Sequence, residues 1–367
     1  MKNKDILILA NNSGGLYRFR KELMQELMNN GYEVYASTPF DDNVEDLKNL
    51  NIHLIETNIN RRGMNPIKDF SLLIKYFKII KEVDPHMIIT YTIKPNLYGS
   101  LAAMLLNKKY AINITGLGTA FQNEGLLKKM VTIWYRFVCK KVNVIFFENK
   151  GNCEVFLKNK IVRKEKCVVL HGAGVNLEDF PFSEYPSDNQ KIHFLFIGRI
   201  MKEKGVDELF EAIQRLNKEN ENVVLDILGN YEDNYKDIVN DLINKGIVNY
   251  YGYQDNVQKY IKQCHCFVLP SYHEGMANTL LECASMGRPL ITSNIHGCKE
   301  AIHDNGYLCN VKDADDLYIK LQEFIKLKYE TKKQLAFNSR KHIEEVFDKK
   351  KVVKETMKGL ELWKYFG

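Results

Sequence analysis

The sequence predicts an α/β protein built from two successive doubly wound domains. Three observations support this prediction. Short apolar runs alternate with amphipathic stretches from the first residues onward, the alternation lapses once near the middle of the chain, and it then resumes. Strands that alternate with helices form parallel sheets with helices on both faces. With 367 residues, of which 45% are apolar, the chain is long enough for two such domains.

The individual elements follow from this alternation. In the first half, runs with the length and composition of strands lie at 5–10, 32–36, 52–55, 87–92, 110–114, 143–147 and 167–170. Helical periodicity lies between them at 15–29, 66–83, 96–106 and 125–141. After the lapse, strands are expected at 192–197, 222–228, 248–252, 266–269 and 289–293, and a last helical segment at about 348–364 has no strand after it.

The domain boundary is expected where the apolar periodicity stops, around Pro181, Ser183, Pro186 and Asp188. This gives an N-terminal domain at 1–180 and a C-terminal domain at 181–347. Eight cysteines without a CxxC pair suggest neither a disulfide framework nor a zinc site. No apolar run has the length of a membrane span, and the first strand leaves no room for a signal peptide, so we expect a soluble cytoplasmic protein.

Charge is distributed unevenly along the chain. Residues 1–176 hold 26 Lys and Arg against 16 Asp and Glu, whereas the remainder holds 26 against 30. A basic half suits a nucleic acid, an anionic membrane surface or a phosphorylated substrate, and a solvated basic face without a partner is the alternative.

The segment 126–141 mixes apolar residues with five cations and no acid. As a helix it would lie on an anionic membrane, unless it is a core helix with solvated lysines.

Two loops rich in glycine follow strands and precede helices. Gly14 and Gly15 would let backbone N–H groups approach a ligand phosphate at a helix N-terminus, although a plain tight turn is the alternative. The G-x-G-x-x-G fingerprint is absent there, which disfavours a nicotinamide oxidoreductase. The second loop runs from Gly198 to Gly205, and its Arg199 and Lys204 suit a diphosphate.

The most specific pattern spans residues 271–282, with the sequence SYHEGMANTLLE, after a strand-like run. Gly275 permits close backbone approach, and the N–H groups near 276–279 would point at an anion from the start of a helix. Glu282, one turn further on, is placed to accept hydrogen bonds from ribose hydroxyls. An acid that interacts with the helix dipole is the alternative for Glu274 and explains Glu282 less well.

Weaker candidates complete the set. Thr115 and Gly116 begin a glycine loop after the strand at 110–114, on the side where a second substrate would enter, or form a simple connector. Cys264-His265-Cys266 resembles a metal cluster but lacks a partner pair, so we expect a structural role. Asp313 and Asp315 form a D-x-D that we assign to helix capping.

The loop from Gly198 to Gly205 and the pattern at 271–282 together resemble glycosyltransferase family 4. The signature of that family is a Glu, seven residues and a second Glu, here Glu274 and Glu282. Lys94-Pro95-Asn96-Leu97-Tyr98-Gly99 and Thr115-Gly116-Leu117-Gly118 resemble the branch that builds capsule, O-antigen and related surface glycans. The resemblance covers nearly the whole chain. It implies a retaining, UDP-sugar-dependent enzyme of the GT-B fold, two Rossmann-like domains facing across a cleft, with segment 348–367 packed back on the first domain.

The resemblance also implies residue roles, without a metal or other cofactor. Arg199, Lys204 and Glu274 would be the catalytic residues. The donor would be bound by Gly14, Gly15, Gly198, Arg199, Lys204, Glu274, Gly275, Met276, Ala277, Asn278, Thr279 and Glu282. The acceptor side would include Tyr91, Lys94, Thr115 and Gly116. Many relatives place a histidine after the fourth strand, where this chain has Thr90-Tyr91-Thr92-Ile93-Lys94, so Tyr91 or Thr92 would fill that space.

The resulting hypothesis is a hexosyl or hexosaminyl transferase that acts on a polyprenyl-diphosphate-linked or growing glycan acceptor. It would work at the inner face of the cell membrane, with an anionic membrane surface as a partner and no nucleic acid. Two alternatives stay open: a nucleotide-sugar epimerase of the same fold, and a non-catalytic sugar- or nucleotide-binding protein.

Overall fold

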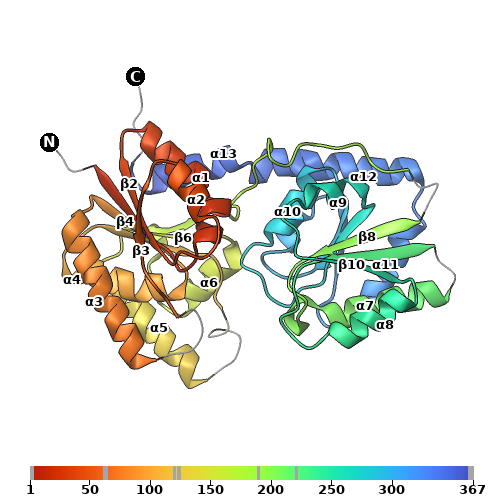
Figure 1. Ribbon diagram of the computed structural model, residues 1–367, viewed down its shortest axis with the longest axis horizontal. Helices are drawn as coiled ribbons and strands as arrows, with labels where there is room; N and C mark the ends of the chain where they lie inside the picture. Colours follow the sequence, from red (N-terminus) through yellow and green to blue (C-terminus); the bar gives the residue numbers. More distant parts are fainter. Residues whose placement is uncertain are drawn as a thin grey trace. The chain divides into compact units, whose positions relative to one another are not determined.

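The computed structural model describes residues 4–60, 65–118, 121, 125–187, 191–219 and 222–362. The chain divides into two compact units (Figure 1). Unit 1 extends to Ala173 and resumes at Lys349, and unit 2 spans Gly174–Asp348. Asp188 of the predicted boundary and residues 363–367 of the predicted last segment lie outside the described residues.

Within the described residues, unit 1 contains a seven-stranded sheet in the order β3-β2-β1-β4-β5-β6-β7, with parallel pairing throughout. The strands are β1 (Asp5–Leu9), β2 (Glu33–Thr38), β3 (His53–Glu56), β4 (Met87–Tyr91), β5 (Tyr110–Ile114), β6 (Val144–Phe147) and β7 (Cys167–Val169). Because successive side chains of a strand point to opposite faces, both faces of this sheet need a helical cover.

The helices of unit 1 supply that cover. They are α1 (Ser13–Asn29), α2 (Val44–Asn49), α3 (Pro66–Val83), the π-helix η1 (Pro95–Gly99), α4 (Ser100–Leu105), α5 (Leu126–Val138), α6 (Lys150–Lys158), the 3₁₀ turn η3 (Lys164–Lys166) and α13 (Lys349–Gly359). Ile6 and Ile8 of β1 share a core with α1, α2 and α13. Leu7 and Leu9 share the other core with η1 and α3 to α6. The last helix therefore packs on the same face as the first.

Unit 2 contains, among its described residues, a six-stranded parallel sheet in the order β10-β9-β8-β11-β12-β13. Its elements are β8 (Ile192–Ile197), η4 (Lys202–Lys204), α7 (Val206–Lys218), β9 (Val223–Leu228), α8 (Lys236–Asn244), β10 (Val248–Gly252), α9 (Gln258–Gln263), β11 (Cys266–Leu269), α10 (Asn278–Ser285), β12 (Leu290–Ser293), η5 (Lys299–Ala301), β13 (Gly306–Cys309), α11 (Ala314–Ile325), α12 (Tyr329–His342) and η6 (Ile343–Phe347).

The strand order of each sheet reverses once, which is where doubly wound sheets bind ligands. In unit 1 the reversal lies between β1 and β4, and in unit 2 it lies between β8 and β11. Loops that leave the carboxyl ends of these strands diverge to opposite sides and open a crevice. The predicted motifs at Gly14, Lys204 and Glu274 follow β1, β8 and β11, and Tyr91 is the last residue of β4.

The predicted strands are confirmed to within two residues at each end, and the helix expected at 66–83 is present with those bounds. The sequence analysis missed β13, a four-residue edge strand that begins with Gly306 and has little apolar length to reveal it. The helix expected at 96–106 consists of η1 followed by α4. Among the described residues, no helix combines the length and the apolarity needed to cross a bilayer.

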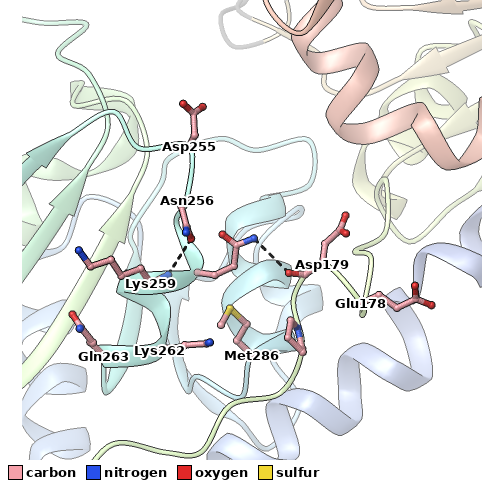
Figure 2. Close-up of a pocket in the computed structure, with 10 residues that line it drawn as sticks. Glu178, Asp179, Asp255, Asn256, Lys259, Lys262, Gln263 and Met286 are labelled. Carbon is pink, nitrogen blue, oxygen red and sulfur yellow. Dashed lines mark hydrogen bonds between the residues drawn. The ribbon is translucent and has the colours of Figure 1, made fainter. Parts of the chain in front are cut away.

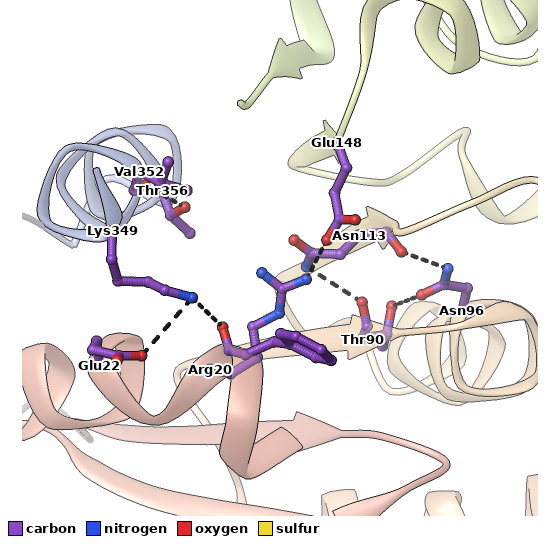
Figure 3. Close-up of polar contacts among 10 residues, drawn as sticks. Arg20, Glu22, Thr90, Asn96, Asn113, Glu148, Lys349, Val352 and Thr356 are labelled. Atoms are coloured by element: carbon purple, nitrogen blue, oxygen red, sulfur yellow. Dashed lines mark hydrogen bonds and ion pairs between the residues drawn. The ribbon is translucent and has the colours of Figure 1, made fainter. Parts of the chain in front are cut away.

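Buried charges connect α13 and α1 to the centre of unit 1 (Figure 3). The Lys349 ammonium donates to the Phe19 carbonyl at 3.2 Å and lies 3.9 Å from the Glu22 carboxylate. Arg20 pairs with Glu148, which directly follows β6, and only 11% and 9% of these two side chains are exposed. A buried ion pair of this kind is destabilising to break, because the remaining charge keeps no partner.

We expect Glu148→Leu to lower the free energy of unfolding by about 3–5 kcal/mol, since the buried Arg20 guanidinium loses its carboxylate partner. The double variant Arg20→Met/Glu148→Leu removes both charges and should recover most of this loss. Urea denaturation of the wild type, Glu148→Leu, Arg20→Met and the double variant measures the coupling between the two residues. Losses that simply add in the double variant would contradict a coupled buried pair.

Candidate active site

The motifs predicted to bind the donor meet in unit 2 at the reversal of its strand order. The loop after β8 contains Arg199 and Lys204, and the loop after β11 contains Glu274. Because β8 and β11 are neighbours in the sheet, their carboxyl ends lie side by side. The Tyr272 amide donates to the Glu203 carbonyl at 2.8 Å, so the two loops are joined through their backbones.

Lys204 and Glu274 form an ion pair between these loops, with 2.5 Å between Nζ and Oε1. Both side chains are largely shielded, with 20% and 13% of their surfaces exposed. Burial and then the Glu274 charge raise the pKa of the neighbouring Cys298 thiol well above its usual value, so this thiol stays neutral. The pair therefore places one cation and one anion beside each other in poorly solvated surroundings, where charge interactions are stronger than in water.

Close backbone contacts hold the two loops in place. A Cβ on Gly205 would lie 2.1 Å from the Pro270 carbonyl oxygen, and the Gly205 φ of +70° is in the left-handed region. Gly297, with φ of +89°, leaves no room for a Cβ against the carbonyl oxygens of Glu274 and Gly275. The Gly297 carbonyl also accepts from the Ala277 amide at 2.9 Å. The sequence analysis missed Gly297, although a glycine after the next strand is the signal that could have found it.

Helix α10 begins at Asn278, a few residues after Glu274 in the same loop. Met276 and Ala277 are buried, and Ala277 at the N-cap provides no side-chain hydrogen bond to the first turn. The Asn278 Oδ1 atom is buried without a hydrogen-bond donor among the described residues. Thr279 and Glu282 follow, and both are half-buried. This helix start combines first-turn N–H groups with a buried amide oxygen, a combination suited to a polar ligand.

Arg199 takes a different position. Its side chain is 55% exposed and lies 3.6 Å from the Glu232 carboxylate, measured from Nη1 to Oε2. Gly198 lies where a Cβ on Gly229 would clash with its carbonyl oxygen, so the loops after β8 and β9 also meet closely. The structure thus brings Lys204 and Glu274 together and places Arg199 at the solvent-exposed edge of the same loop.

The glycines of unit 1 have clear local contacts. The Gly15 amide donates to the Asn12 side chain, and a Cβ on Gly14 would lie 2.8 Å from the Asp42 Cβ. The Asp41 carboxylate accepts from the Ser13 amide at 2.9 Å. A carboxylate and an amide oxygen of the chain itself thus bind the first N–H groups of α1.

The predicted acceptor-side residues lie around the ends of β4 and β5. Tyr91 is buried, with the Arg20 guanidinium 4.6 Å from its ring centroid. Burial raises the pKa of Tyr91, and the nearby Arg20 opposes this shift. Thr92 has a φ of +71°, an unusual conformation for a β-branched residue that marks a constrained site. The Lys94 ammonium pairs with the buried Asp69 at 2.7 Å.

Thr115 and Gly116 directly follow β5 and are half-buried. Next to them, the Asn96 amide donates to the Asn113 carbonyl at 2.9 Å, and the Thr90 hydroxyl donates to Asn96 Oδ1 at 2.7 Å (Figure 3). The sequence analysis missed Asp69, Glu148 and this amide network. An acid directly after a buried strand could have revealed Glu148, whereas Asp69 has no comparable signal.

The residues judged structural from the sequence have structural contacts. The His265 Nδ1 atom accepts from the His193 amide at 3.0 Å, and the Cys264 and Cys266 thiols contact backbone carbonyls. Among the described residues, no three or more His, Cys, Asp or Glu side chains group in a way that could hold a metal. Asp313 caps α11, since its Oδ1 atom accepts from the Asp316 amide at 2.9 Å.

An open groove of about 800 Å³ lies elsewhere in unit 2 (Figure 2). It is lined by Glu178, Asp179, Pro181, Asp255, Asn256, Gln258, Lys259, Lys262, Gln263 and Met286. Three acids and two lysines contribute to its lining, and none of the predicted donor-binding residues does. The groove is therefore separate from the Lys204–Glu274 pair.

Comparison with known proteins identifies the kind of enzyme that carries this site. The chain is 28% identical over 335 residues to the N,N'-diacetylbacillosaminyl-diphospho-undecaprenol alpha-1,3-N-acetylgalactosaminyltransferase of Campylobacter jejuni, covering 85% of this chain and 87% of that protein. It is 28% identical over 277 residues to the UDP-Gal:alpha-D-GlcNAc-diphosphoundecaprenol alpha-1,3-galactosyltransferase of Escherichia coli, covering 69% and 70%. The crystal structure of a glycosyltransferase from Rickettsia africae covers all of both chains with a TM-score of 0.81 at 18% identity.

The family matches divide the chain as the fold does. A glycosyl transferase 4-like family model matches residues 5–149, and the model of glycosyl transferases group 1 matches residues 178–342. The expected GT-B fold class is confirmed by the two doubly wound sheets and by the solved structure that superposes on the whole chain. The chain is therefore a glycosyltransferase, composed of a glycosyl transferase 4-like unit and a group 1 unit.

Proposed function

We propose that this enzyme transfers a hexose or hexosamine from a UDP-sugar, with retention of the anomeric configuration, to a polyprenyl-diphosphate-linked or other growing glycan of the bacterial surface. The observation that carries the donor side is the shielded Lys204–Glu274 pair at the strand reversal of unit 2. The names of the Campylobacter and Escherichia relatives support the lipid-linked acceptor and α-linked product. An α-linked product made from an α-linked UDP-sugar retains its configuration.

The proposed roles follow from the charges that the reaction creates. The sugar carbon becomes electron-poor while negative charge grows on the departing diphosphate. Lys204, Arg199 and the first N–H groups of α10, at Asn278 and Thr279, would stabilise that charge, so electrostatic stabilisation is the main catalytic effect. Glu274 with the backbone of Gly275, Met276 and Ala277 would hold the donor sugar, and Glu282 would bind the ribose.

The ion pair makes these roles compatible. An unpaired carboxylate beside a diphosphate would repel it, whereas the charge of Glu274 is balanced by the Lys204 ammonium at 2.5 Å. The ammonium is preorganised by Glu274, so little reorganisation accompanies the growth of charge on the leaving group. The proposed donor position therefore needs both residues together.

A membrane surface is the proposed second partner. On α5 the apolar side chains of Leu126, Met130, Ile133 and Phe137 are 76%, 41%, 59% and 47% exposed, at helical spacing. Lys129, Arg136 and Lys140 are exposed beside them. Exposed apolar residues continue on the neighbouring α4 and on α3, which contacts α4, at Leu105, Ile67, Phe70 and Ile74. An apolar face flanked by cations suits an anionic lipid surface, where the lipid-linked acceptor would be anchored.

The function is tested by incubating the protein with UDP-N-acetylgalactosamine, UDP-N-acetylglucosamine, UDP-galactose and UDP-glucose. A synthetic polyprenyl-diphospho-N-acetylglucosamine serves as the acceptor. We expect UDP release that depends on the acceptor, with an α-linked product by NMR. Conversion of a UDP-sugar without acceptor would instead indicate an epimerase, and UDP binding without turnover would indicate a binding protein.

Lys204→Ala should lower kcat by roughly 100–1000-fold, because one preorganised donor to the leaving group is worth about 2.7–4 kcal/mol. Glu282→Gln should mainly raise the donor KM, by an amount equivalent to about 1.5–3 kcal/mol, since ribose contacts change little during the reaction. Steady-state kinetics measure both effects. Lys202→Ala, which removes an exposed cation of the same loop, is the control, and wild-type turnover of Lys204→Ala at saturating donor contradicts the diphosphate role.

We expect the protein to co-sediment with phosphatidylcholine vesicles only when they contain phosphatidylglycerol. Each cation near an anionic surface contributes about 1 kcal/mol, so Lys129→Gln/Lys140→Gln should weaken binding by roughly 30-fold. The control Lys218→Gln/Lys236→Gln removes two exposed lysines of unit 2 and should leave binding unchanged. Equal binding to neutral and anionic vesicles, or an equal loss in both double variants, contradicts docking through α5.

A further inference from the structure

The loop that carries Glu274 has a second side-chain anchor, away from the reacting groups. The Tyr272 hydroxyl donates to the Glu208 carboxylate, with 2.7 Å and 2.9 Å to its two oxygens. Glu208 lies in the first turn of α7, which begins directly after the loop that carries Lys204. A phenol that lies near both oxygens of one carboxylate is held in a well-defined orientation, because a bond to a charged acceptor is stronger than a neutral one.

The rest of the Tyr272 side chain is equally constrained. Its ring is buried, and the Lys312 ammonium lies 5.0 Å from the ring centroid. Its amide donates to the Glu203 carbonyl, the residue next to Lys204. Burial, followed by the Glu208 carboxylate, raises the Tyr272 pKa, so the hydroxyl keeps its proton and remains a donor.

These contacts connect Tyr272 to the backbone next to both charged residues of the proposed donor position. It lies two residues before Glu274, and its amide holds the backbone one residue before Lys204. We propose that Tyr272 and Glu208 are positioning residues that set the geometry of the Lys204–Glu274 pair for transfer. This inference rests on the proposed function and adds two residues to it that do not touch the donor.

Unit 2 contains a second hydrogen bond from a tyrosine to the first turn of α7, which does not involve the loop that carries Glu274. The Tyr235 hydroxyl donates to the Asp207 carboxylate at 2.8 Å. Asp207 is the neighbour of Glu208 in the same first turn of α7, but Tyr235 precedes α8 and is not in the loop after β11. Removing either phenol hydroxyl deletes the same kind of hydrogen bond to the same helix turn. Only one deletion frees the loop that carries Glu274.

The test compares Tyr272→Phe with Tyr235→Phe in melting temperature, UDP affinity by calorimetry, and kcat and KM with the UDP-sugar panel. Both variants should lose similar thermal stability. Tyr272→Phe should lower kcat about tenfold, because small misplacements of catalytic groups are costly. Tyr235→Phe should stay within about twofold of the wild-type kcat, since its bond touches neither loop of the ion pair.

Variants of the partner carboxylate separate positioning from folding. Glu208→Gln keeps an oxygen acceptor for the Tyr272 hydroxyl and should retain most of the wild-type kcat. Glu208→Leu should lower kcat by the same factor as Tyr272→Phe. The double variant Tyr272→Phe/Glu208→Leu should be no slower than either single variant, because the two residues act as one unit. Multiplied losses in the double variant, or equal kcat values for Tyr272→Phe and Tyr235→Phe, would overturn the inference.

The wild-type measurement distinguishes the two proposals. If the wild-type protein neither binds UDP nor turns over any sugar of the panel, the proposed function fails and the positioning role fails with it. If the wild type is active and only the comparison between the tyrosine variants fails, the positioning role alone is overturned.

Discussion

The ion pair between Lys204 and Glu274 is the interaction on which the candidate active site in unit 2 depends. It can form only because the strand order reverses between β8 and β11, so that loops 70 residues apart in sequence leave the sheet side by side. The glycines at 205 and 297 permit the close backbone contacts that bring the loops together. The helix start at Asn278 then follows Glu274 in the same loop. The ion pair, the strand order and the glycines that permit close backbone contact thus fix the relative positions of these loops.

Unit 1 has the same strand reversal but uses it differently. At the end of β4, Arg20 pairs with Glu148 and lies over the ring of Tyr91. The first amides of α1 are bound by Asn12 and Asp41 of the chain itself. Buried charges that pair with one another favour a fixed local shape. The same topology therefore brings an ion pair between two loops in unit 2 and a buried polar network beside the central strands in unit 1.

The sequence predicts the fold well because burial leaves a periodic trace. Apolar runs such as 192–197 and helical spacing such as 66–83 reappear with nearly the same bounds, whereas the short edge strand β13 has too few apolar residues to be seen. The motifs around Lys204 and Glu274 were visible, but their pairing was not. Contacts such as Tyr272 with Glu208, or Arg20 with Glu148, join residues 64 and 128 apart and follow no period. Such contacts depend on the tertiary fold and leave no local pattern.

The position of α13 affects the order in which the protein can fold during synthesis. Unit 2 is continuous in sequence, whereas the sheet of unit 1 is covered on one face by a helix that the ribosome makes after all of unit 2. Until α13 emerges, the Lys349 ammonium, Val352, Val353 and Met357 are absent from the side of unit 1 that contains Ile6 and Ile8. Unit 2 can therefore complete its core first, and the half of the enzyme that begins the chain is the last to be finished.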